Sequence, residues 1–283
     1  KALLQIMYNF KIWWLVVTKN IHVGFSSSIT PAHISRVTKM RSILIDDDDD
    51  EVEPLFVKWG HAFADYVLSP ACIIRSTNKL VSYNGYHELA YLHPNRFTPD
   101  ASILSEIGVT EGEKYFVLRF NAFKAHHDVG VQGLSKENKW KIIRLLENKG
   151  RVFITTEREI DPEFRDYKLH LSPEKIHSLL YYATMLIGDS QTMTSEAALL
   201  GTPAIRSNTF VGRLECIEEE EHKYELTYGF LPEDYEAMQT KIEELLALPN
   251  LKEIWAERRQ RMLADKIDVT DFFVKFIEGS CGK

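Results

Sequence analysis

Apolar and polar positions follow one pattern twice along the chain: a short apolar run, a turn of small or polar residues, and a longer stretch with helical spacing. In the first half the runs predict strands at 21–25, 42–45 and 66–69, with helices at 31–39 and 52–64 between them. Strand, turn, helix and strand at this spacing are typical of a parallel sheet built from βαβ units.

The second half starts the same pattern again after residue 112. Its strands are expected at 115–120, 151–156, 168–171, 185–188 and 203–207, and its helices at 135–148, 173–183, 192–200, 234–248, 251–265 and 269–278. Between the halves, residues 70–112 are rich in proline and aromatic residues, which indicates an ordered connection rather than a flexible linker. We therefore predict an α/β protein with two Rossmann-like parallel-sheet domains and a cleft between them. The predicted domains are 1–110 and 111–283, with the last helix returning to the first domain.

The chain opens with Lys1 and enters an apolar, helix-like stretch, residues 2–17, with no cap residue ahead of it. Most intact domains begin with a strand or a capped helix. We expect the first domain to be incomplete and to lack its first βα units; a trimmed or processed N-terminus is the alternative.

The net charge, the apolar runs and the cysteines of the chain argue against several classes of function. The net charge of −7 argues against a general nucleic-acid-binding role, because phosphate contacts need a basic surface. The longest apolar run, residues 12–17, is too short to span a bilayer. The three cysteines are widely spaced and form no CxxC pair, which favours a reducing, cytoplasmic location and argues against structural zinc. The oligomeric state stays open, a homodimer included.

The segment from Met185 to Arg206 is the most informative one. A buried strand is expected to end at Gly188-Asp189-Ser190, where a hydroxyl-rich turn opens a helix that runs to Gly201. A helix N-terminus offers free N–H groups and a positive dipole end, which suit a diphosphate. Hydroxyl donors and one carboxylate stand in its first turns: Ser190, Thr192, Thr194, Ser195 and Glu196. Ordinary helix capping explains the same residues, so local chemistry leaves both interpretations open.

Resemblance adds to this interpretation. The segment is similar to the C-terminal half of GT-B proteins, in particular the UDP-N-acetylglucosamine 2-epimerases. More closely, nearly the whole chain resembles the DUF354 family of archaea and bacteria. The motifs that carry the resemblance are residues 83–94 (YNGYHELAYLHP), 97–100 (FTPD), 118–120 (LRF), 124–130 (KAHHDVG) and 188–206. The resemblance implies a GT-B fold and a UDP-sugar site around Asp189, Ser190 and Glu196. It also implies that the chain lacks the opening strand and loop of intact family members.

A second candidate site follows the strand that ends near Arg119. The loop after it carries a cation, two imidazoles and a carboxylate within five positions: Lys124, His126, His127 and Asp128. Doubly wound folds bind ligands at this end of a strand. We expect His126, His127 and Asp128 to be catalytic, and Arg119 and Lys124 to bind substrate; a solvated polar loop is the alternative. No HExxH motif or cysteine partner supports zinc here.

Two further segments are weaker candidates. The acidic run Asp46 to Asp50 follows a strand and has the oxygen ligands that Mg²⁺ or Mn²⁺ prefers, but it also suits a solvated acidic turn. Residues 83–93 place His87 and Glu88 among aromatics, which could stack on a sugar or pack between domains. No P-loop and no GxGxxG occurs, which argues against an NTPase or a dehydrogenase.

The sequence and the resemblance together predict an enzyme that acts on a nucleotide-activated sugar, by glycosyl transfer or by epimerisation. The expected partner is the nucleotide sugar itself, with no metal and no other cofactor. A non-catalytic protein that binds a nucleotide or a glycan on the same scaffold is the competing hypothesis, because fold alone does not decide function.

Overall fold

The computed structural model describes residues 2–110, 112–120, 133–156 and 159–281. The chain divides into two compact units. Unit 1 comprises Lys1–Ala90 and Lys266–Lys283, and unit 2 comprises Tyr91–Asp265. The two are described separately below.

Unit 1 is built on a parallel sheet of four strands in the order β1-β2-β3-β4. The strands are β1 (Val23–Ser26), β2 (Arg41–Ile45), β3 (Tyr66–Pro70) and β4 (Leu80–Tyr83). The connecting helices are α2 (Ile29–Ser35), α3 (Pro54–Phe56) and the π-helix η1 (Val57–His61), and the unit also holds α1 (Ala2–Lys19) and α12 (Val269–Cys281). The sequence order of the strands is also their spatial order, as in one half of a doubly wound sheet.

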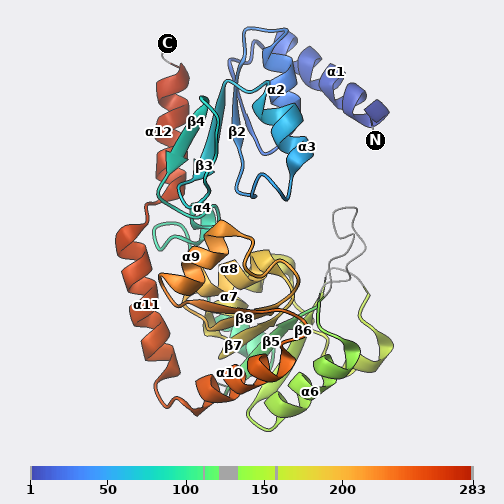
Figure 1. Ribbon diagram of the computed structural model, residues 1–283, viewed down its shortest axis with the longest axis vertical. Helices are drawn as coiled ribbons and strands as arrows, with labels where there is room; N and C mark the ends of the chain where they lie inside the picture. Colours follow the sequence, from blue (N-terminus) through green and yellow to red (C-terminus); the bar gives the residue numbers. More distant parts are fainter. Residues whose placement is uncertain (1, 111, 121–132, 157–158, 282–283) are drawn as a thin grey trace. The chain divides into compact units, whose positions relative to one another are not determined.

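Helices cover both faces of this sheet (Figure 1). On one face, Ala32 of α2 packs with Leu44 and Val67 of the central strands. On the other face, Phe273 of α12 lies 5.2 Å from Phe25 and 5.3 Å from Tyr83, measured between ring centroids. Helix α12 therefore contributes to the core of unit 1.

Unit 2 has a parallel sheet of five strands in the order β6-β5-β7-β8-β9. The strands are β5 (Tyr115–Arg119), β6 (Arg151–Thr155), β7 (Met185–Gly188), β8 (Ala204–Ser207) and β9 (Thr227–Phe230). The α-helices are α5 (Ser102–Glu106), α6 (Lys136–Glu147), α7 (Ile176–Tyr182), α8 (Gln191–Leu200), α9 (Glu215–His222), α10 (Tyr235–Ala247) and α11 (Leu251–Asp265). Helix α4 (Leu89–Leu92) spans the division between the units, and the 3-10 helices η2 (Pro162–Tyr167) and η3 (Pro173–Lys175) lie between β6 and α7.

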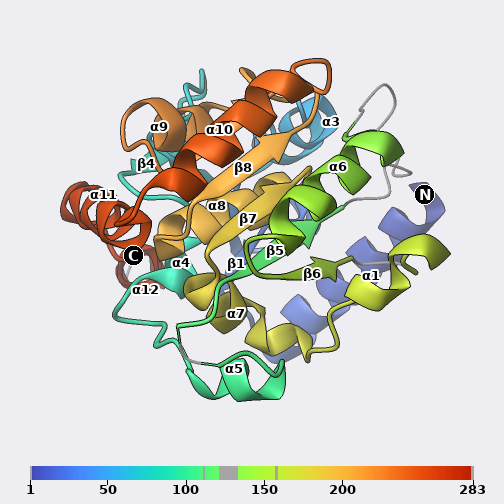
Figure 2. The ribbon, with the colours of Figure 1, turned by 90° about the horizontal axis from the view of Figure 1, so that it is seen from below.

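Helices α7 and α8 cover one face of this sheet, and α6 and α10 cover the other (Figures 1 and 2). All five residues of β5 and all four of β7 are buried, as expected of central strands covered on both faces. On the α7 and α8 face, Val117 and Leu186 pack with Leu179 and Ala197 in one hydrophobic cluster.

The prediction of two Rossmann-like parallel-sheet domains is confirmed. The predicted boundary at residue 110 lies twenty positions after the division seen in the structure. Residues 91–110 belong to unit 2 because Leu92, Ile103, Ile107 and Val109 are buried in its hydrophobic cluster.

Three sheet predictions differ from the structure. Strand β4 lies inside the segment predicted as a connection, and β9 was not predicted at all. Both are four-residue strands without an alternating pattern, so they carry little local signal. The predicted strand at 168–171 amounts to an isolated bridge from Lys168 to Ile154. Among the residues that the structure describes, no helix has the length and apolar character needed to cross a membrane.

Candidate functional site

The carboxyl ends of β5 and β7 define the candidate site of unit 2. In the sheet, β6 lies on one side of β5, whereas β7, β8 and β9 lie on its other side. Open parallel sheets bind ligands outside the carboxyl ends of the strands at such a switch point. Arg119 and Gly188 pair here as the last residues of their strands.

Gly188 allows the two strand ends to approach closely. A Cβ atom at this position would lie 2.1 Å from the carbonyl oxygen of Arg119, far inside van der Waals contact. The next amide, that of Asp189, donates to the same carbonyl at 3.0 Å. Asn208, which follows β8, donates from its side chain to the carbonyl of Asp189 at 3.0 Å. The turn that starts α8 is therefore fixed between the ends of three strands.

Helix α8 begins at this turn with free backbone donors. Ser190 is its N-cap, with extended backbone and a hydroxyl oxygen that accepts from the amide of Met193 at 3.4 Å. No atom among the described residues accepts from the amides of Gln191 and Thr192, which are two of the four orphan donors of a helix start. The helix ends at Gly201, whose φ of +83° is the left-handed conformation that favours glycine.

Two of the predicted hydroxyl donors are used inside unit 2. Thr194 donates to the carbonyl of Ser190 at 2.6 Å, and Ser195 donates to the Oε1 of Glu220 at 2.6 Å. Both residues are buried. The hydroxyl of Thr192 is exposed instead. The donors of this helix start that bond to none of the described residues are therefore the amides of Gln191 and Thr192, the Thr192 hydroxyl and the hydroxyl hydrogen of Ser190.

Glu196 is held by two residues that local sequence reasoning did not connect with it. Its Oε1 accepts from the hydroxyl of Tyr91 at 2.9 Å and from Nε2 of His177 at 3.0 Å. The rings of Tyr91 and His177 lie 5.3 Å apart. Its second oxygen, Oε2, accepts no hydrogen bond from the described residues. Tyr91 lies 105 positions from Glu196 in sequence, so only the fold brings them together.

Two charged residues predicted for this site are largely buried beside it. Arg119 is 8% exposed, and its guanidinium donates to the hydroxyl of Thr155 on β6 at 3.5 Å. Asp189 is 1% exposed. Lys124, His126, His127 and Asp128 follow β5 in sequence but lie outside the residues that the structure describes, so their assignment stays a prediction.

Arg206 at the end of β8 was not among the predicted site residues, and it fixes the loop that follows. Its buried guanidinium donates to Glu218 at 2.6 Å, and the amide of Gly212 donates to the same carboxylate oxygen at 3.0 Å. Burial raises the pKa of Glu218, but the hydrogen bonds from Arg206 and Gly212 outweigh it, so the pKa lies below its ordinary value. The charged carboxylate therefore anchors residues 207–214 next to the candidate site.

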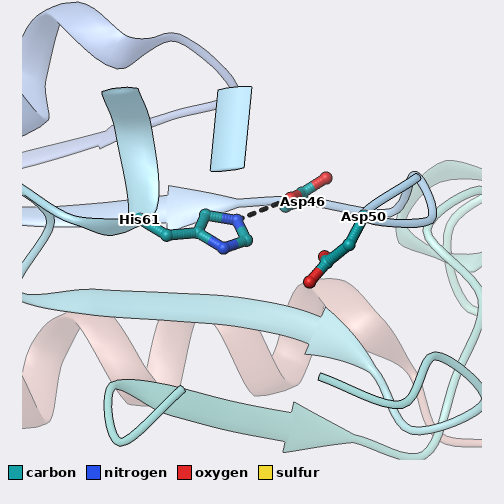
Figure 3. Close-up of side chains that lie close together, drawn as sticks. All are labelled: Asp46, Asp50 and His61. Carbon is teal, nitrogen blue, oxygen red and sulfur yellow. Dashed lines mark hydrogen bonds and ion pairs between the residues drawn. The ribbon is translucent and has the colours of Figure 1, made fainter. Parts of the chain in front are cut away.

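Unit 1 contains a separate cluster of charged side chains at the carboxyl ends of β2 and β3. Nε2 of His61 lies 2.6 Å from Oδ2 of Asp46, and both side chains are nearly buried (Figure 3). The fully buried guanidinium of Arg75 contacts Asp46 at 3.0 Å, also pairs with Asp50, and donates to the hydroxyl of Ser69 at 2.8 Å. Of the acidic run, Asp46 and Asp50 are thus parts of an ion-pair network.

The ligand atoms of Asp46, Asp50 and His61 lie within 4.8 Å of one another, which is a spacing that could hold a metal ion. Arg75 argues against one, because its guanidinium already binds both carboxylates and a cation would have to displace it. The expectation that the protein needs no metal stays a prediction.

Comparisons with solved structures identify the fold as GT-B-like. A UDP-N-acetylglucosamine 2-epimerase matches with a TM-score of 0.61 at 14% identity, over 92% of this chain and 75% of the other. The spinosyn forosaminyltransferase SpnP matches with a TM-score of 0.63 at 11% identity, over 96% and 80% of the two chains. The UDP-GlcNAc 2-epimerase of Methanocaldococcus jannaschii, solved in complex with UDP-GlcNAc and UDP, matches with a TM-score of 0.58 at 13% identity, over 92% and 80%.

Sequence comparison gives the family. The chain belongs to the family described as "Protein of unknown function (DUF354)", whose model matches residues 71–277. No curated protein matches the sequence.

Proposed function

We propose that this protein is an enzyme that acts on a nucleotide-activated sugar, by glycosyl transfer or by UDP-sugar epimerisation. The observation that carries the proposal is the start of α8: two backbone amides that donate to none of the described residues, at the switch point of a parallel sheet and beside the end of β5 that carries Arg119. Such a helix start binds phosphate groups through its N–H donors and its dipole. The similar folds named for UDP-sugar epimerases and glycosyltransferases support this class of substrate.

In this proposal the diphosphate lies on the amides of Gln191 and Thr192. Glu196 stands one turn further along the helix, with Oε2 left to accept hydrogen bonds from ribose or sugar hydroxyls. Charge that develops on the diphosphate as the bond to the sugar breaks is stabilised by the helix dipole, the hydroxyls and the cations Arg119 and Lys124. His126 or His127, oriented by Asp128, supplies the acid or base.

Incubation of the full chain with UDP-N-acetylglucosamine and other UDP-sugars, followed by chromatography of the products, tests the proposal. Release of UDP together with the sugar bound to an added acceptor identifies transfer, release of UDP with free sugar identifies hydrolysis of the same bond, and a changed sugar with intact UDP-sugar linkage identifies epimerisation. Binding of UDP-sugars by calorimetry without any turnover favours the non-catalytic binding protein. Absence of binding contradicts both.

A further inference from the structure

Unit 1 has a pocket of about 270 Å³ next to its buried ion-pair network. Its polar lining comes from two segments, the end of η1 with the acidic loop before it and the turn that precedes β4. The side chains are Asp50, His61, Ser76, Thr77, Asn78 and Lys79, and Val57 and Ala62 add a small apolar wall. The volume lies just below the range typical of drug-sized ligands, so the pocket fits a smaller molecule.

Asp46 determines which tautomer the His61 imidazole adopts in this pocket. Because Oδ2 of Asp46 lies 2.6 Å from Nε2 of His61, the tautomer of the neutral form that fits this contact has its hydrogen on Nε2 and donates it to the carboxylate. Nδ1 lies on the other side of the ring (Figure 3) and bonds to none of the described residues. Nδ1 is therefore an acceptor left for a ligand.

Other groups in the lining act as donors and acceptors of hydrogen bonds. Lys79 donates to the carbonyls of His61 at 3.1 Å and Ala62 at 2.8 Å, which leaves one of its three ammonium hydrogens. Thr77 accepts from the amide of Lys79 at 3.3 Å, so its hydroxyl hydrogen stays available. The exposed amide of Asn78 can both donate and accept.

This mixture does not suit a simple ion. A bound anion would face the Asp50 carboxylate, and a bound cation would face Lys79 and the Arg75 guanidinium behind Asp46. A neutral molecule with several hydroxyl groups can use donors and acceptors of both kinds at once.

We propose that the pocket of unit 1 binds a neutral hydroxyl-rich ligand of the size of one sugar ring, with Nδ1 of His61 accepting a hydrogen bond from one ligand hydroxyl. Asp46 is a positioning residue, because it acts only through the tautomer and orientation of His61. Binding at this pocket requires no nucleotide on unit 2.

The direct test is ¹⁵N NMR of the histidine side chains in the full chain. The probes are glucose and N-acetylglucosamine, with inorganic phosphate and Mn²⁺ as the ionic comparators. His61→Gln assigns the His61 signals, and His22→Gln, at an exposed position of the same unit, is the matched control. We expect a saturable shift of the His61 Nδ1 signal with at least one sugar, and none for His22.

Variants on the pocket wall test the same site without touching the Asp46–His61–Arg75 network. Thr77→Val and Asn78→Ala each remove one side-chain hydrogen bond, so we expect each to weaken sugar binding roughly fivefold. The proposal is overturned if neither sugar shifts His61, if only phosphate or Mn²⁺ does, or if both wall variants bind the sugars as the parent protein does.

Discussion

Gly188 is the residue at which the sheet of unit 2 and its candidate site meet. Without a side chain, it lets β7 end against the carbonyl of Arg119, and the Asp189 amide then bonds to that same carbonyl. The sequence predicted the strand end and the turn here, because an apolar run stops at a Gly-Asp-Ser triplet. It did not predict which hydroxyls stay free, since the partner of Ser195 is Glu220 on α9, a helix that was not predicted.

The catalytic prediction concerns His126 and His127. Replacing each in turn by Gln keeps a hydrogen-bonding side chain and removes the titration near neutral pH. If one of them is the acid or base, turnover of a UDP-sugar by that variant should fall by roughly 10²–10⁴, with little change in melting temperature. Near-normal turnover by both variants, measured under saturating substrate, defeats the assignment.

Asp48 gives a prediction about stability and pH. Burial and the nearby carboxylates of Asp47 and Asp46 raise its pKa from 3.8 to about 6. An acid whose pKa is raised by folding stabilises the fold while protonated, so this contribution is complete below pH 3.8 and is lost as the pH rises through 6. Asp48→Asn should therefore unfold at higher denaturant concentration than the parent at pH 7, and no higher at pH 3.5.

The expected gain is about 1 kcal/mol or less, because more than a third of Asp48 is exposed and solvent screens the repulsion. Urea titrations across this pH range measure it. Asp166→Asn, at an exposed position of unit 2, is the control and should show no such gain. A parent protein more stable than Asp48→Asn at pH 7 would contradict the assignment.

At the scale of elements, α8 and the strands beside it were predicted almost to the residue, whereas one edge strand of each sheet, β4 and β9, was not predicted. Strand β7 and helix α8 have a continuous apolar run, a hydroxyl cap and a terminal glycine, all of which are local signals. Strands β4 and β9 are held by pairing with β3 and β8 and have no comparable local pattern. The contacts of Glu196 with Tyr91 on α4 and His177 on α7 join three separate helices, so spacing within one segment could not reveal them.

The helix start itself is tested by two variants. Thr192→Ala removes an exposed hydroxyl without disturbing the cap, and it should weaken UDP binding without lowering stability. Ser190→Ala also removes the acceptor for the Met193 amide, so it should cost about 1 kcal/mol of stability besides affinity. The double variant should lose about 1–3 kcal/mol of UDP binding by calorimetry. Thr240→Ala, at an exposed position on α10, is the control; unchanged UDP affinity in the folded double variant shows that the hydroxyls serve only as caps.

At the scale of the whole molecule, the chain forms two units, and unit 1 is made of two segments that unit 2 separates in sequence. Residues 266–283 return to unit 1, and their helix α12 covers one face of its sheet. The aromatic contacts of Phe273 with Phe25 and Tyr83 join segments that are far apart in the chain, which is why periodicity predicts the helix but not the residues that it covers.

Phe273→Ala should therefore destabilise unit 1 by about 3–5 kcal/mol, the usual cost of removing a buried aromatic side chain. Hydrogen exchange should show faster exchange in β1 to β4, and unchanged exchange in β5, β7 and β8. Val274→Ala, one position along the same helix and 47% exposed, should change neither the stability of unit 1 nor its hydrogen exchange. Equal destabilisation of both units by Phe273→Ala would show that they do not have separate cores.

The central claim, that a nucleotide diphosphate binds at the start of α8, is tested most directly by backbone amide exchange of the full chain with and without UDP. The claim predicts slower exchange of the Gln191 and Thr192 amides at saturating UDP, since these two donors have no acceptor among the described residues of the free protein. UDP at the same concentration should slow the exchange of these two amides less in the Ser190→Ala, Thr192→Ala double variant. Unchanged exchange at both amides, or protection confined to residues of unit 1, would contradict the claim.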